Sequence, residues 1–292
     1  MSREARNRPT DQTAAKTGSP DAGGAPFQDP APVVLITGSS KGIGRETARL
    51  FLAAGYAVVI NGRNPSKLSQ TLSALDDGRG KLLAVAGDVT REKDAENLIG
   101  SALRSFGRLD VLINNAGISM RGRFEETTGE VFRRMFDTNL VGSAVVTRAA
   151  LPALRESRGS LLFISSLAGL RGFPGIAAYS AAKMGLTAYA DALRIELAGT
   201  GIHVGIVYVG FTENDPDKTV YRGDGSQEAI TRSSQSSQKD VAKAIFRVVR
   251  RRKKVSYLTV FGPLLRFAQR YFPSVVEFGL RRSAKKVFSM SK

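Results

Sequence analysis

The feature that most constrains the fold is the alternation of short, almost wholly apolar runs with longer stretches of helical periodicity. Strands buried on both faces have this composition, because crossover helices cover both sides of a parallel sheet. The strands are predicted at VVLIT (33–37), AVVIN (57–61), KLLAVA (81–86), DVLIN (110–114), SLLFIS (160–165) and HVGIVYV (203–209), with YLTVF (257–261) as a candidate seventh. Helices are predicted near 43–54, 65–76, 91–106, 128–156 and 178–198.

This order predicts an α/β fold: a single Rossmann-type, doubly wound parallel sheet of about seven strands, with helices on both faces. One domain then accounts for residues 31–262. Residues 1–30 are rich in Pro, Gly, Ala, Thr and charge, lack apolar periodicity and offer no apolar run of the kind a secretory signal needs. We expect them to form a disordered tail, and residues 263–292 to form a basic amphipathic helical extension.

Cysteine is absent from the 292 residues, and histidine occurs once. The chain can therefore form no disulfide and no thiolate metal site, and a histidine-rich zinc site is not expected. We expect no metal cofactor. The lack of cysteine also fits a reducing compartment, so we expect a cytoplasmic protein.

The run TGSSKGIG (37–44) directly follows the first predicted strand and opens the first predicted helix. Gly38, Gly42 and Gly44 let the backbone turn tightly and approach a pyrophosphate, whose charge the free amides at the helix start can accept. Such a turn alone is a weak signal. Its place after the first strand of an α/β pattern predicts a dinucleotide site.

The end of the second predicted strand bears on the choice of dinucleotide. A site that prefers NAD usually has a carboxylate there for the ribose 2′-hydroxyl, but this chain reads NGRN at 61–64. Arg63, together with Lys41 in the glycine-rich run, suits a 2′-phosphate instead. We therefore expect NADP(H) in preference to NAD(H). Either cation taken alone is equally well explained as a solvated surface residue.

Further motifs follow in order along the chain. Asp88 and Val89 follow the third strand, NNAG (114–117) the fourth, and Ser165 and Ser166 the fifth, while Asn139 lies in the helical region between. Tyr179 and Lys183 then stand four residues apart, which places them on one face of a helix. In this order and spacing, the motifs resemble those of the short-chain dehydrogenase/reductase family over about residues 33–210.

The resemblance implies roles for individual residues. Asp88 and Val89 would hold the adenine, and Asn114 to Gly117 would brace the sheet beside the cofactor. Ser166, rather than Ser165, is similar in spacing to the family's catalytic serine, and Asn139 resembles the asparagine that holds a water in the proton relay. The catalytic residues would be Asn139, Ser166, Tyr179 and Lys183. The cofactor-binding residues would be Thr37, Gly38, Ser39, Ser40, Lys41, Gly42, Ile43, Gly44, Arg63, Asp88, Val89, Asn115, Ala116, Gly117, Tyr179, Lys183, Gly210 and Thr212.

The chemistry of Tyr179 and Lys183 can be argued from the residues themselves. Reduction of a carbonyl needs a hydride from the nicotinamide and a proton for the developing alkoxide. The ordinary pKa of a tyrosine hydroxyl is about 10, and a nearby cation favours the phenolate. A lysine one turn away supplies that charge. Ser166 can donate a second hydrogen bond to the same oxygen. Alone, the pair could equally be a packed tyrosine and a solvated lysine. His203 has no partner motif and is interpreted as structural.

The family pattern breaks after the sixth predicted strand. A Pro-Gly pair is usual there, but this chain has Val209, Gly210, Phe211 and Thr212. The polar stretch from Glu213 to Gln238 is interpreted either as a lid over a ligand or as a mobile surface loop. Apolar residues in the loop after Ser166 favour a lipophilic carbonyl substrate, although loop packing explains them equally well: Leu167, Leu170 and Phe173.

The basicity of the chain is concentrated at its end. Of the formal net charge of +17, residues 239–292 contribute +13. No uncharged apolar run there reaches the roughly 20 residues of a membrane span, but two basic amphipathic helices are predicted, which can lie on an anionic membrane surface. Alternatively, the two helices cover the substrate pocket, form a subunit contact or present a solvated face. Nucleic acid is not an expected partner, because no base-reading motif accompanies the charge.

The sequence therefore predicts an NADP(H)-dependent oxidoreductase that acts on a carbonyl or secondary alcohol, with a lipophilic small molecule as its substrate. We expect it in the cytoplasm, or peripheral on the cytoplasmic face of a membrane through residues 263–292. The alternative is a non-catalytic dinucleotide sensor or membrane-surface scaffold of the same fold. Members of the family often form homodimers or homotetramers, and the resemblance implies the same here.

Overall fold

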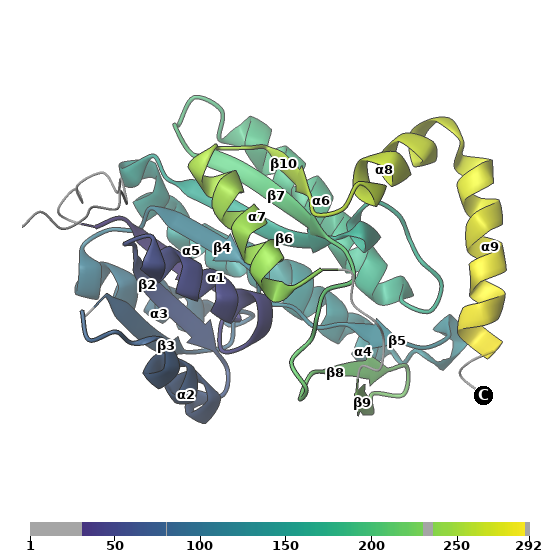
Figure 1. Cartoon of the computed structure of the whole chain (residues 1–292), viewed down its shortest axis with the longest axis horizontal. Helices are drawn as coiled ribbons and strands as arrows, with labels where there is room; N and C mark the ends of the chain where they lie inside the picture. The colour runs from purple at the N-terminus through teal and green to yellow at the C-terminus, as the bar shows by residue number, and fades with distance from the viewer. Residues whose placement is uncertain (1–30, 80, 230–235, 290–292) are drawn as a thin grey trace, which may run out of the picture.

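Seven parallel strands form the central sheet of the computed structural model, which describes residues 31–79, 81–229 and 236–289. The tail predicted at residues 1–30 lies outside the described residues. Across the sheet the strands lie in the order β10 (Val255–Tyr257), β7 (His203–Val209), β6 (Ser160–Ser166), β4 (Val111–Asn114), β1 (Val33–Ile36), β2 (Ala57–Gly62) and β3 (Leu82–Ala86) (Figure 1). The chain winds outward from β1 to β3 and then returns to β4, so the predicted doubly wound sheet is confirmed.

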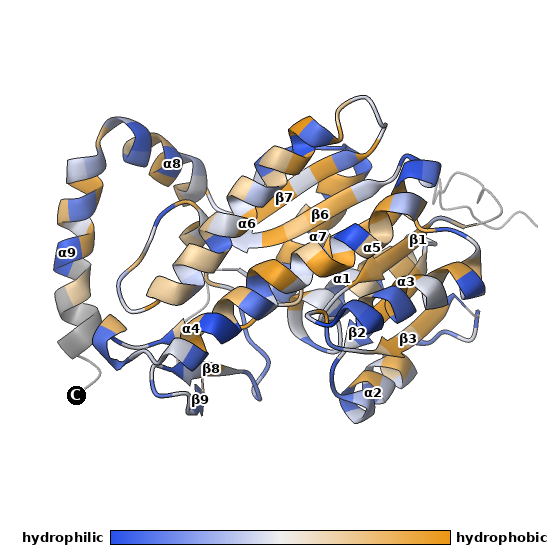
Figure 2. Ribbon diagram, turned by 180° about the vertical axis from the view of Figure 1, so that it is seen from behind, coloured by the Kyte–Doolittle hydropathy of each residue, from blue (hydrophilic) through white to orange (hydrophobic). Residues whose placement is uncertain are grey.

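Helices cover both faces of this sheet, as the two sets of alternating strand residues require. Val33 and Leu35 face one layer, and Val34 and Ile36 face the other. The first layer consists of α3 (Glu92–Phe106), α5 (Gly142–Ser157) and α6 (Ala177–Glu196). The second consists of α1 (Gly42–Ala53), α2 (Pro65–Leu75) and α7 (Gln238–Arg250). Figure 2 shows the apolar strands between these helices.

The winding direction reverses between β1 and β4, which pair directly: Val34 lies opposite Val111 and Ile36 opposite Ile113. In open α/β sheets, ligands bind outside the carboxyl ends of the strands at such a switch point. The fold therefore predicts a ligand site beyond Ile36 and Asn114, where the predicted motifs TGSSKGIG and NNAG begin.

The helical region predicted at 128–156 is interrupted. It consists of α4 (Gly129–Phe136), a π-helical segment at Asp137–Val141 and α5, and the Gly142 amide donates to the carbonyl oxygen of Asp137. An i→i+5 hydrogen bond of this kind inserts one extra residue into a helix. Hydrophobic periodicity over so long a stretch does not reveal a single inserted residue.

The seventh strand exists, but the bounds predicted for it as a candidate, 257–261, are wrong. The strand is β10, which pairs Val255–Tyr257 with Ile206–Tyr208 of β7. Val260 and Phe261, read as strand residues, are exposed, and Phe261 opens a helix. Pro263 fits the first turn of that helix because a first-turn amide has no helical partner.

The polar stretch after β7 contains strands that were not predicted. β8 (Thr219–Arg222) and β9 (Gln227–Ala229) form a hairpin, and β8 also pairs with β5 (Met120–Arg121). Tyr221 of β8 packs against a small apolar cluster that includes Met120 and Met135. Tyr179 packs against the same cluster. This second sheet therefore lies beside the catalytic tyrosine predicted from the sequence.

Two helices follow β10, in the predicted extension: α8 (Phe261–Tyr271) and α9 (Pro273–Ser289). The buried residues Gly262 and Leu265 anchor α8, and its Arg266 donates a 2.9 Å hydrogen bond to the Tyr257 hydroxyl. α9 stands apart from the sheet in both views (Figures 1 and 2). Within the described parts of the chain, none of the helices combines the length and the apolarity that a membrane span requires.

Candidate active site

The glycine-rich run and the NNAG motif meet at the switch point. Gly38 has a φ of +61°, a left-handed conformation that favours glycine, and a Cβ built on it would lie 2.7 Å from the Ala116 Cα. A Cβ on Gly44 would lie 2.6 Å from the Asn115 amide nitrogen Nδ2. Both glycines are therefore required by space, and Gly38 also by its backbone conformation.

Hydrogen bonds hold the two motifs together. The backbone amides of Asn115 and Ala116 each donate to the Thr37 hydroxyl over 3.0 Å. The Asn115 side chain donates over 2.9 Å to the carbonyl oxygens of Thr37 and Gly38. These contacts fix the shape of the loop.

The amino terminus of α1 has the features of an anion site. Lys41 is the N-cap residue, and its side chain does not cap the first amides of the helix. Those amides and the helix dipole favour a negative group. Gly42, with a φ of +62°, begins the helix at this point. The geometry fits the pyrophosphate of a dinucleotide.

At the end of β2, Arg63 lies with its guanidinium nitrogen 3.9 Å from a carboxylate oxygen of Asp88. Asp88 accepts hydrogen bonds from the backbone and side chain of Thr90, so its carboxylate is held in place. Ser39 and Asn61 link the loop to β2, because the Asn61 amide donates to the Ser39 hydroxyl over 2.9 Å. The cofactor residues that were predicted after separate strands thus lie together at the carboxyl ends of those strands.

Sequence reasoning missed one cation here, Lys67. Its ammonium group lies 2.6 Å from a carboxylate oxygen of Asp217, and the Lys41 ammonium lies 3.1 Å from the same oxygen. A signal for it existed: Lys67 occupies the first turn of α2, three residues after the capping residue Asn64, and a side chain there lies close to the end of β2. No sequence signal indicated Asp217, which is distant along the chain.

Tyr179 and Lys183 lie one turn apart on α6, as predicted. The Lys183 ammonium is 5.9 Å from the centroid of the Tyr179 ring and donates a 2.9 Å hydrogen bond to the carbonyl oxygen of Ile164. Lys183 is buried. Burial, and then the charge of Lys218, lower the pKa of its ammonium from 10.5 to about 8.

The two serines at the end of β6 have different surroundings. The Ser166 hydroxyl is partly exposed and accepts a 3.2 Å hydrogen bond from the Ala168 amide. Ser165 is buried, and a Cβ built on Gly169 would lie 2.4 Å from its hydroxyl oxygen. Ser166 is therefore the one of the pair that a ligand can reach.

Asn139 lies in the π-helical segment and is fully buried. Its side chain donates to the carbonyl oxygens of Ile118 and Met135 over 3.0 and 2.9 Å, and accepts from the Ile118 amide over 3.3 Å. A Cβ on Gly117 would lie 2.7 Å from the Asn139 side-chain oxygen and 3.6 Å from the Lys183 ammonium. The structure thus brings Gly117, Asn139 and Lys183 together.

The turn after β7 is where the sequence departs from the Pro-Gly pair that is usual in the family. Val209 continues the strand and lies opposite Ser166 in the sheet. Thr212 is buried, its hydroxyl donates to the Gly210 carbonyl oxygen over 3.3 Å, and it forms a bridge with Ser236. The turn is therefore closed without proline, next to the strand end that carries Ser166.

The loop residues read as a sign of a lipophilic ligand do not all line the site. Leu170 packs against the core layer that holds α3, α5 and α6. Tyr179 packs instead against a buried apolar cluster of Met120, Val131 and Met135.

His203 lies at the first residue of β7, at the opposite end of the sheet from Ser166. Its Nε2 is 2.9 Å from the Lys253 carbonyl oxygen, and burial lowers its pKa. It links β7 to the turn before β10 and takes no part in the site. Elsewhere in the described chain, no three His, Asp or Glu side chains are grouped closely enough to hold a metal ion.

Comparisons with known proteins bear on this geometry. The family model described as "short chain dehydrogenase" matches residues 32–224. "Dehydrogenase/reductase SDR family member 7B" of Danio rerio is 33% identical over 241 residues, which are 79% of this chain and 78% of that protein.

Two solved structures are also similar. A short-chain dehydrogenase from Streptomyces avermitilis has a TM-score of 0.73 at 29% identity, over 88% of this chain and 98% of that one. A 3-ketoacyl-(acyl-carrier-protein) reductase from Brucella melitensis, complexed with NADH, has a TM-score of 0.66 at 27% identity, over 77% of this chain and 95% of that one.

Proposed function

Since the chain belongs to the short-chain dehydrogenase family of oxidoreductases, we propose that it transfers a hydride between NADP(H) and a carbonyl or secondary alcohol of a lipophilic small molecule. The observation that carries this proposal is the buried Lys183 ammonium, which lies 5.9 Å from the centroid of the Tyr179 ring and is hydrogen-bonded to Ile164 of the strand that ends at Ser166. A sensor that only bound the dinucleotide would have no need to bury a lysine next to a tyrosine.

The residues at the switch point fit a nicotinamide dinucleotide. The glycines leave space that a Cβ would fill, and the uncapped start of α1 offers amides to a pyrophosphate. Thr37 and Asn115 hold this loop, and Asp88 and Val89 would hold the adenine. When bound, the nicotinamide supplies or accepts a hydride at its C4 atom.

The protein's own residues manage the proton. In reduction the Tyr179 hydroxyl donates its proton to the carbonyl oxygen, and in oxidation the phenolate accepts it back. The positive charge of Lys183 favours the phenolate, and the Ser166 hydroxyl donates a hydrogen bond that stabilises charge on the reacting oxygen. Asn139 fixes the backbone of Ile118 beside them and would hold the relay water.

The preference for NADP(H) rests on charge at the end of β2. The sequence there, Asn61 to Asn64, contains no carboxylate for a ribose 2′-hydroxyl, while Lys41 and Arg63 provide cations for a 2′-phosphate. The substrate class is supported by three partly buried apolar side chains that pack with Tyr179 on the same buried cluster: Ile118, Phe132 and Tyr221. The acyl substrate class named for the similar Brucella reductase agrees with it.

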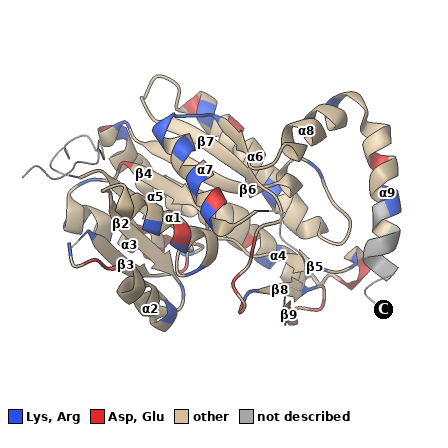
Figure 3. Cartoon of the chain, viewed as in Figure 1, with Lys and Arg blue, Asp and Glu red and all other residues tan. Residues whose placement is uncertain are grey.

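Contact with an anionic membrane surface is proposed for α8 and α9. Four apolar side chains three or four residues apart follow one face of α8 and are all exposed: Phe261, Leu264, Phe267 and Tyr271. The opposite face is anchored to the protein, and basic residues follow on α9 (Figure 3). Such a helix pair lies in a membrane interface with its apolar face in the lipid. We place the protein in the cytoplasm, peripheral on the cytoplasmic face of a membrane.

A homodimer or homotetramer is proposed to form through α6. Its side chains Met184 and Ile195 are 44% and 79% exposed, and a second copy would cover them. Sedimentation of the purified chain tests this directly, and a monomer at micromolar concentration would exclude it.

The function is tested by titrating the protein with NADPH and with NADH while following nicotinamide fluorescence, on wild type and Arg63→Ala in parallel. We expect tight NADPH binding that weakens in the variant. A panel of lipophilic ketones should then be reduced with NADPH. Binding without turnover on any carbonyl would favour a dinucleotide sensor, and failure to bind either cofactor would overturn the oxidoreductase proposal.

A further inference from the structure

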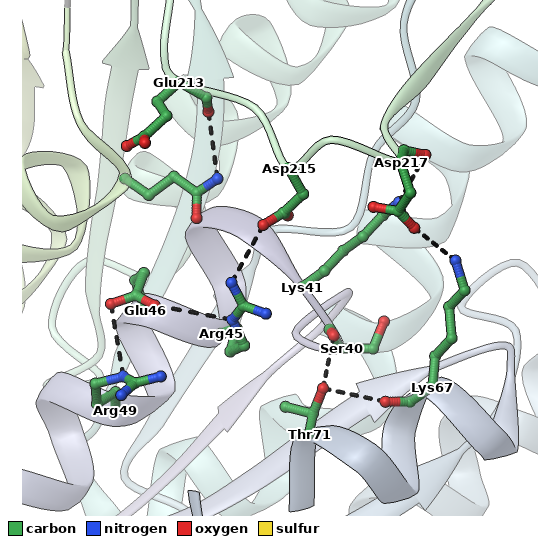
Figure 4. A network of polar contacts seen from close by, with 11 residues as sticks. Ser40, Lys41, Arg45, Glu46, Arg49, Lys67, Thr71, Glu213, Asp215 and Asp217 are labelled. Atoms are coloured by element: carbon green, nitrogen blue, oxygen red, sulfur yellow. Dashed lines mark hydrogen bonds and ion pairs between the residues drawn. The ribbon is translucent and has the colours of Figure 1, made fainter. Parts of the chain in front are cut away.

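The segment Glu213–Lys218, called here the acidic strap, crosses the glycine-rich loop (Figure 4). The Glu213 amide donates to the Ser236 carbonyl oxygen over 2.9 Å, and the Gln238 side chain donates to the Glu213 carbonyl oxygen over 3.4 Å. At its other end, the Lys218 amide donates to the Asp215 carbonyl oxygen over 3.0 Å, which forms a turn. The turn directs two carboxylates, those of Asp215 and Asp217, at the loop.

Asp217 lies between the two lysines. The ammonium groups of Lys67 and Lys41 lie 2.6 and 3.1 Å from one and the same carboxylate oxygen. Hydrogen bonds from Lys67 and then Lys41 lower the pKa of the Asp217 carboxyl to about 2, so it is ionised at neutral pH. The two cations therefore converge on a single anionic oxygen, as they would on an oxygen of a phosphate group.

Asp215 lies at the start of α1. One of its carboxylate oxygens would be 3.3 Å from a Cβ on Gly42, and the other lies 3.2 Å from an Arg45 guanidinium nitrogen. Its side chain is only 14% exposed. A carboxylate thus stands against the uncapped helix end, which is the position that the pyrophosphate of a dinucleotide takes in this kind of loop.

We infer that the acidic strap is a built-in competitor for the phosphate groups of NADP(H). Asp217 occupies the position between Lys41 and Lys67 at which the 2′-phosphate would bind, called here the 2′-phosphate seat. Asp215 occupies the position at which the pyrophosphate would bind. Lys67 is then a residue that determines cofactor specificity. This inference rests on the proposed function, because it requires a dinucleotide at this loop.

The charges decide which anion occupies the seat. A phosphate monoester carries about −1.5 to −2 at neutral pH and has three acceptor oxygens, whereas Asp217 carries one charge and engages both lysines through one oxygen. A 2′-phosphate therefore displaces Asp217. NADH has no 2′-phosphate and leaves the pair of lysines to the strap. Arg63 lies against Asp88 and not against Asp217, so it adds its charge to that of the two lysines when a 2′-phosphate binds.

The test compares NADPH and NADH binding to the full-length chain in wild type, Asp217→Asn and Lys67→Met. Asp224→Asn is the matched control, because Asp224 is an exposed aspartate at the turn between β8 and β9 that accepts hydrogen bonds from Ser226 and lies outside the acidic strap. Because exposed ion pairs contribute modestly, we expect Asp217→Asn to tighten NADPH binding about threefold to tenfold and to leave NADH binding unchanged. We expect Lys67→Met to weaken NADPH binding about tenfold, again without effect on NADH.

Other results overturn the inference. If Asp217→Asn weakens NADPH, or changes both cofactors equally, the strap supports the loop and does not compete with phosphate. If Lys67→Met binds NADPH as wild type does, Lys67 lies outside the seat. In these cases NADPH still binds, so the proposed function stands. If neither cofactor binds to wild type or to Asp217→Asn, the proposed function fails and the inference fails with it. Thermal unfolding of each variant confirms that it is folded.

Discussion

The Lys183 ammonium donates a 2.9 Å hydrogen bond to the Ile164 carbonyl oxygen. Ile164 lies two residues before the end of β6, so this bond fastens α6 to the strand that presents Ser166. The same lysine lies beneath the Tyr179 ring. One side chain thus ties the helix with the tyrosine to the strand with the serine, and places its charge near the tyrosine ring.

Replacing Tyr179 by Phe removes the proposed proton donor and keeps the ring. We expect turnover to fall about 10²- to 10⁴-fold, the usual contribution of general acid–base catalysis, while the dissociation constant for NADPH stays within about twofold of wild type. Steady-state rates and fluorescence titrations measure the two quantities.

Tyr189→Phe is the control for that substitution. Tyr189 lies on the same helix, is partly buried, and packs against Phe163 in the core. Loss of its hydroxyl should leave the rate almost unchanged. If Tyr179→Phe retained the wild-type rate, another group would have to supply the proton.

The buried ammonium of Lys183 makes stability depend on pH. Its pKa is about 8 in the folded chain against an ordinary value of 10.5. Between those values the unfolded chain keeps a proton that the folded chain has released, so the free energy of unfolding rises with pH in that window. Below about pH 8 both states are protonated, and the folded state bears the cost of a buried charge.

We therefore expect Lys183→Met to lose this rise, which amounts to about 2 kcal/mol between pH 7.5 and 10. Urea unfolding of wild type and variant at several pH values measures it. Lys239→Met, at an exposed site on α7, should keep the wild-type slope. An unchanged slope in Lys183→Met would show that another group titrates.

Gly38→Ala is expected to abolish tight dinucleotide binding. The added Cβ would meet Ala116 at 2.7 Å and would strain the backbone at a φ of +61°. Gly78→Ala is the matched control, since Gly78 has a φ of +75° but nothing lies within 4 Å of its added Cβ. Both variants bear about 1–2 kcal/mol of left-handed strain, so the difference between them isolates the contact with Ala116.

Calorimetric unfolding and NADPH titration of the two glycine variants give that difference. We expect the free energy of unfolding to fall further in Gly38→Ala than in Gly78→Ala, and only Gly38→Ala to weaken NADPH. Equal affinity in both variants would mean that the loop can move away from Ala116 without loss of function.

The membrane proposal predicts flotation with anionic vesicles. Wild type should bind vesicles that contain phosphatidylserine, and this binding should weaken as the salt concentration is raised. It should not bind vesicles of neutral phosphatidylcholine. Leu264→Ser with Phe267→Ser should reduce binding about tenfold or more, since each buried apolar side chain contributes about 1.5–3 kcal/mol. Phe124→Ser, which removes a similarly exposed aromatic ring elsewhere, should bind as wild type. Binding that persists in the double variant would point to another surface.

The sequence predicted the central sheet well because its strands are buried on both faces. Residues Val33–Ile36 are fully buried, and an uninterrupted apolar run of that length has few other interpretations. The bounds of β10 were predicted wrongly for the opposite reason. Val255–Tyr257 are only partly buried, while the more apolar Val260 and Phe261 that follow are exposed. Apolar composition identifies buried strands and misplaces an edge strand next to an exposed apolar surface.

The site was predicted where its residues come from short motifs, and missed where it comes from contacts between distant segments. Tyr179 and Lys183 lie four residues apart, so one helix brings them together. Lys67 and Asp217 are separated by 150 residues, and only the path of the chain after β7 brings them into contact. Composition described that stretch as polar but carried no information about where its carboxylates lie.

The π-helical segment at Asp137–Val141 sets the rotational phase between α4 and α5. An α-helix turns about 100° per residue, so removal of the extra residue would swing α4 by that angle about the axis of α5. Met135, now fully buried beside Tyr179, would leave the apolar cluster, and Asn139 would lose its hold on Ile118. The length of this stretch is therefore as tightly specified as any side chain in it, and a deletion of one residue would disassemble a site that no substitution had touched.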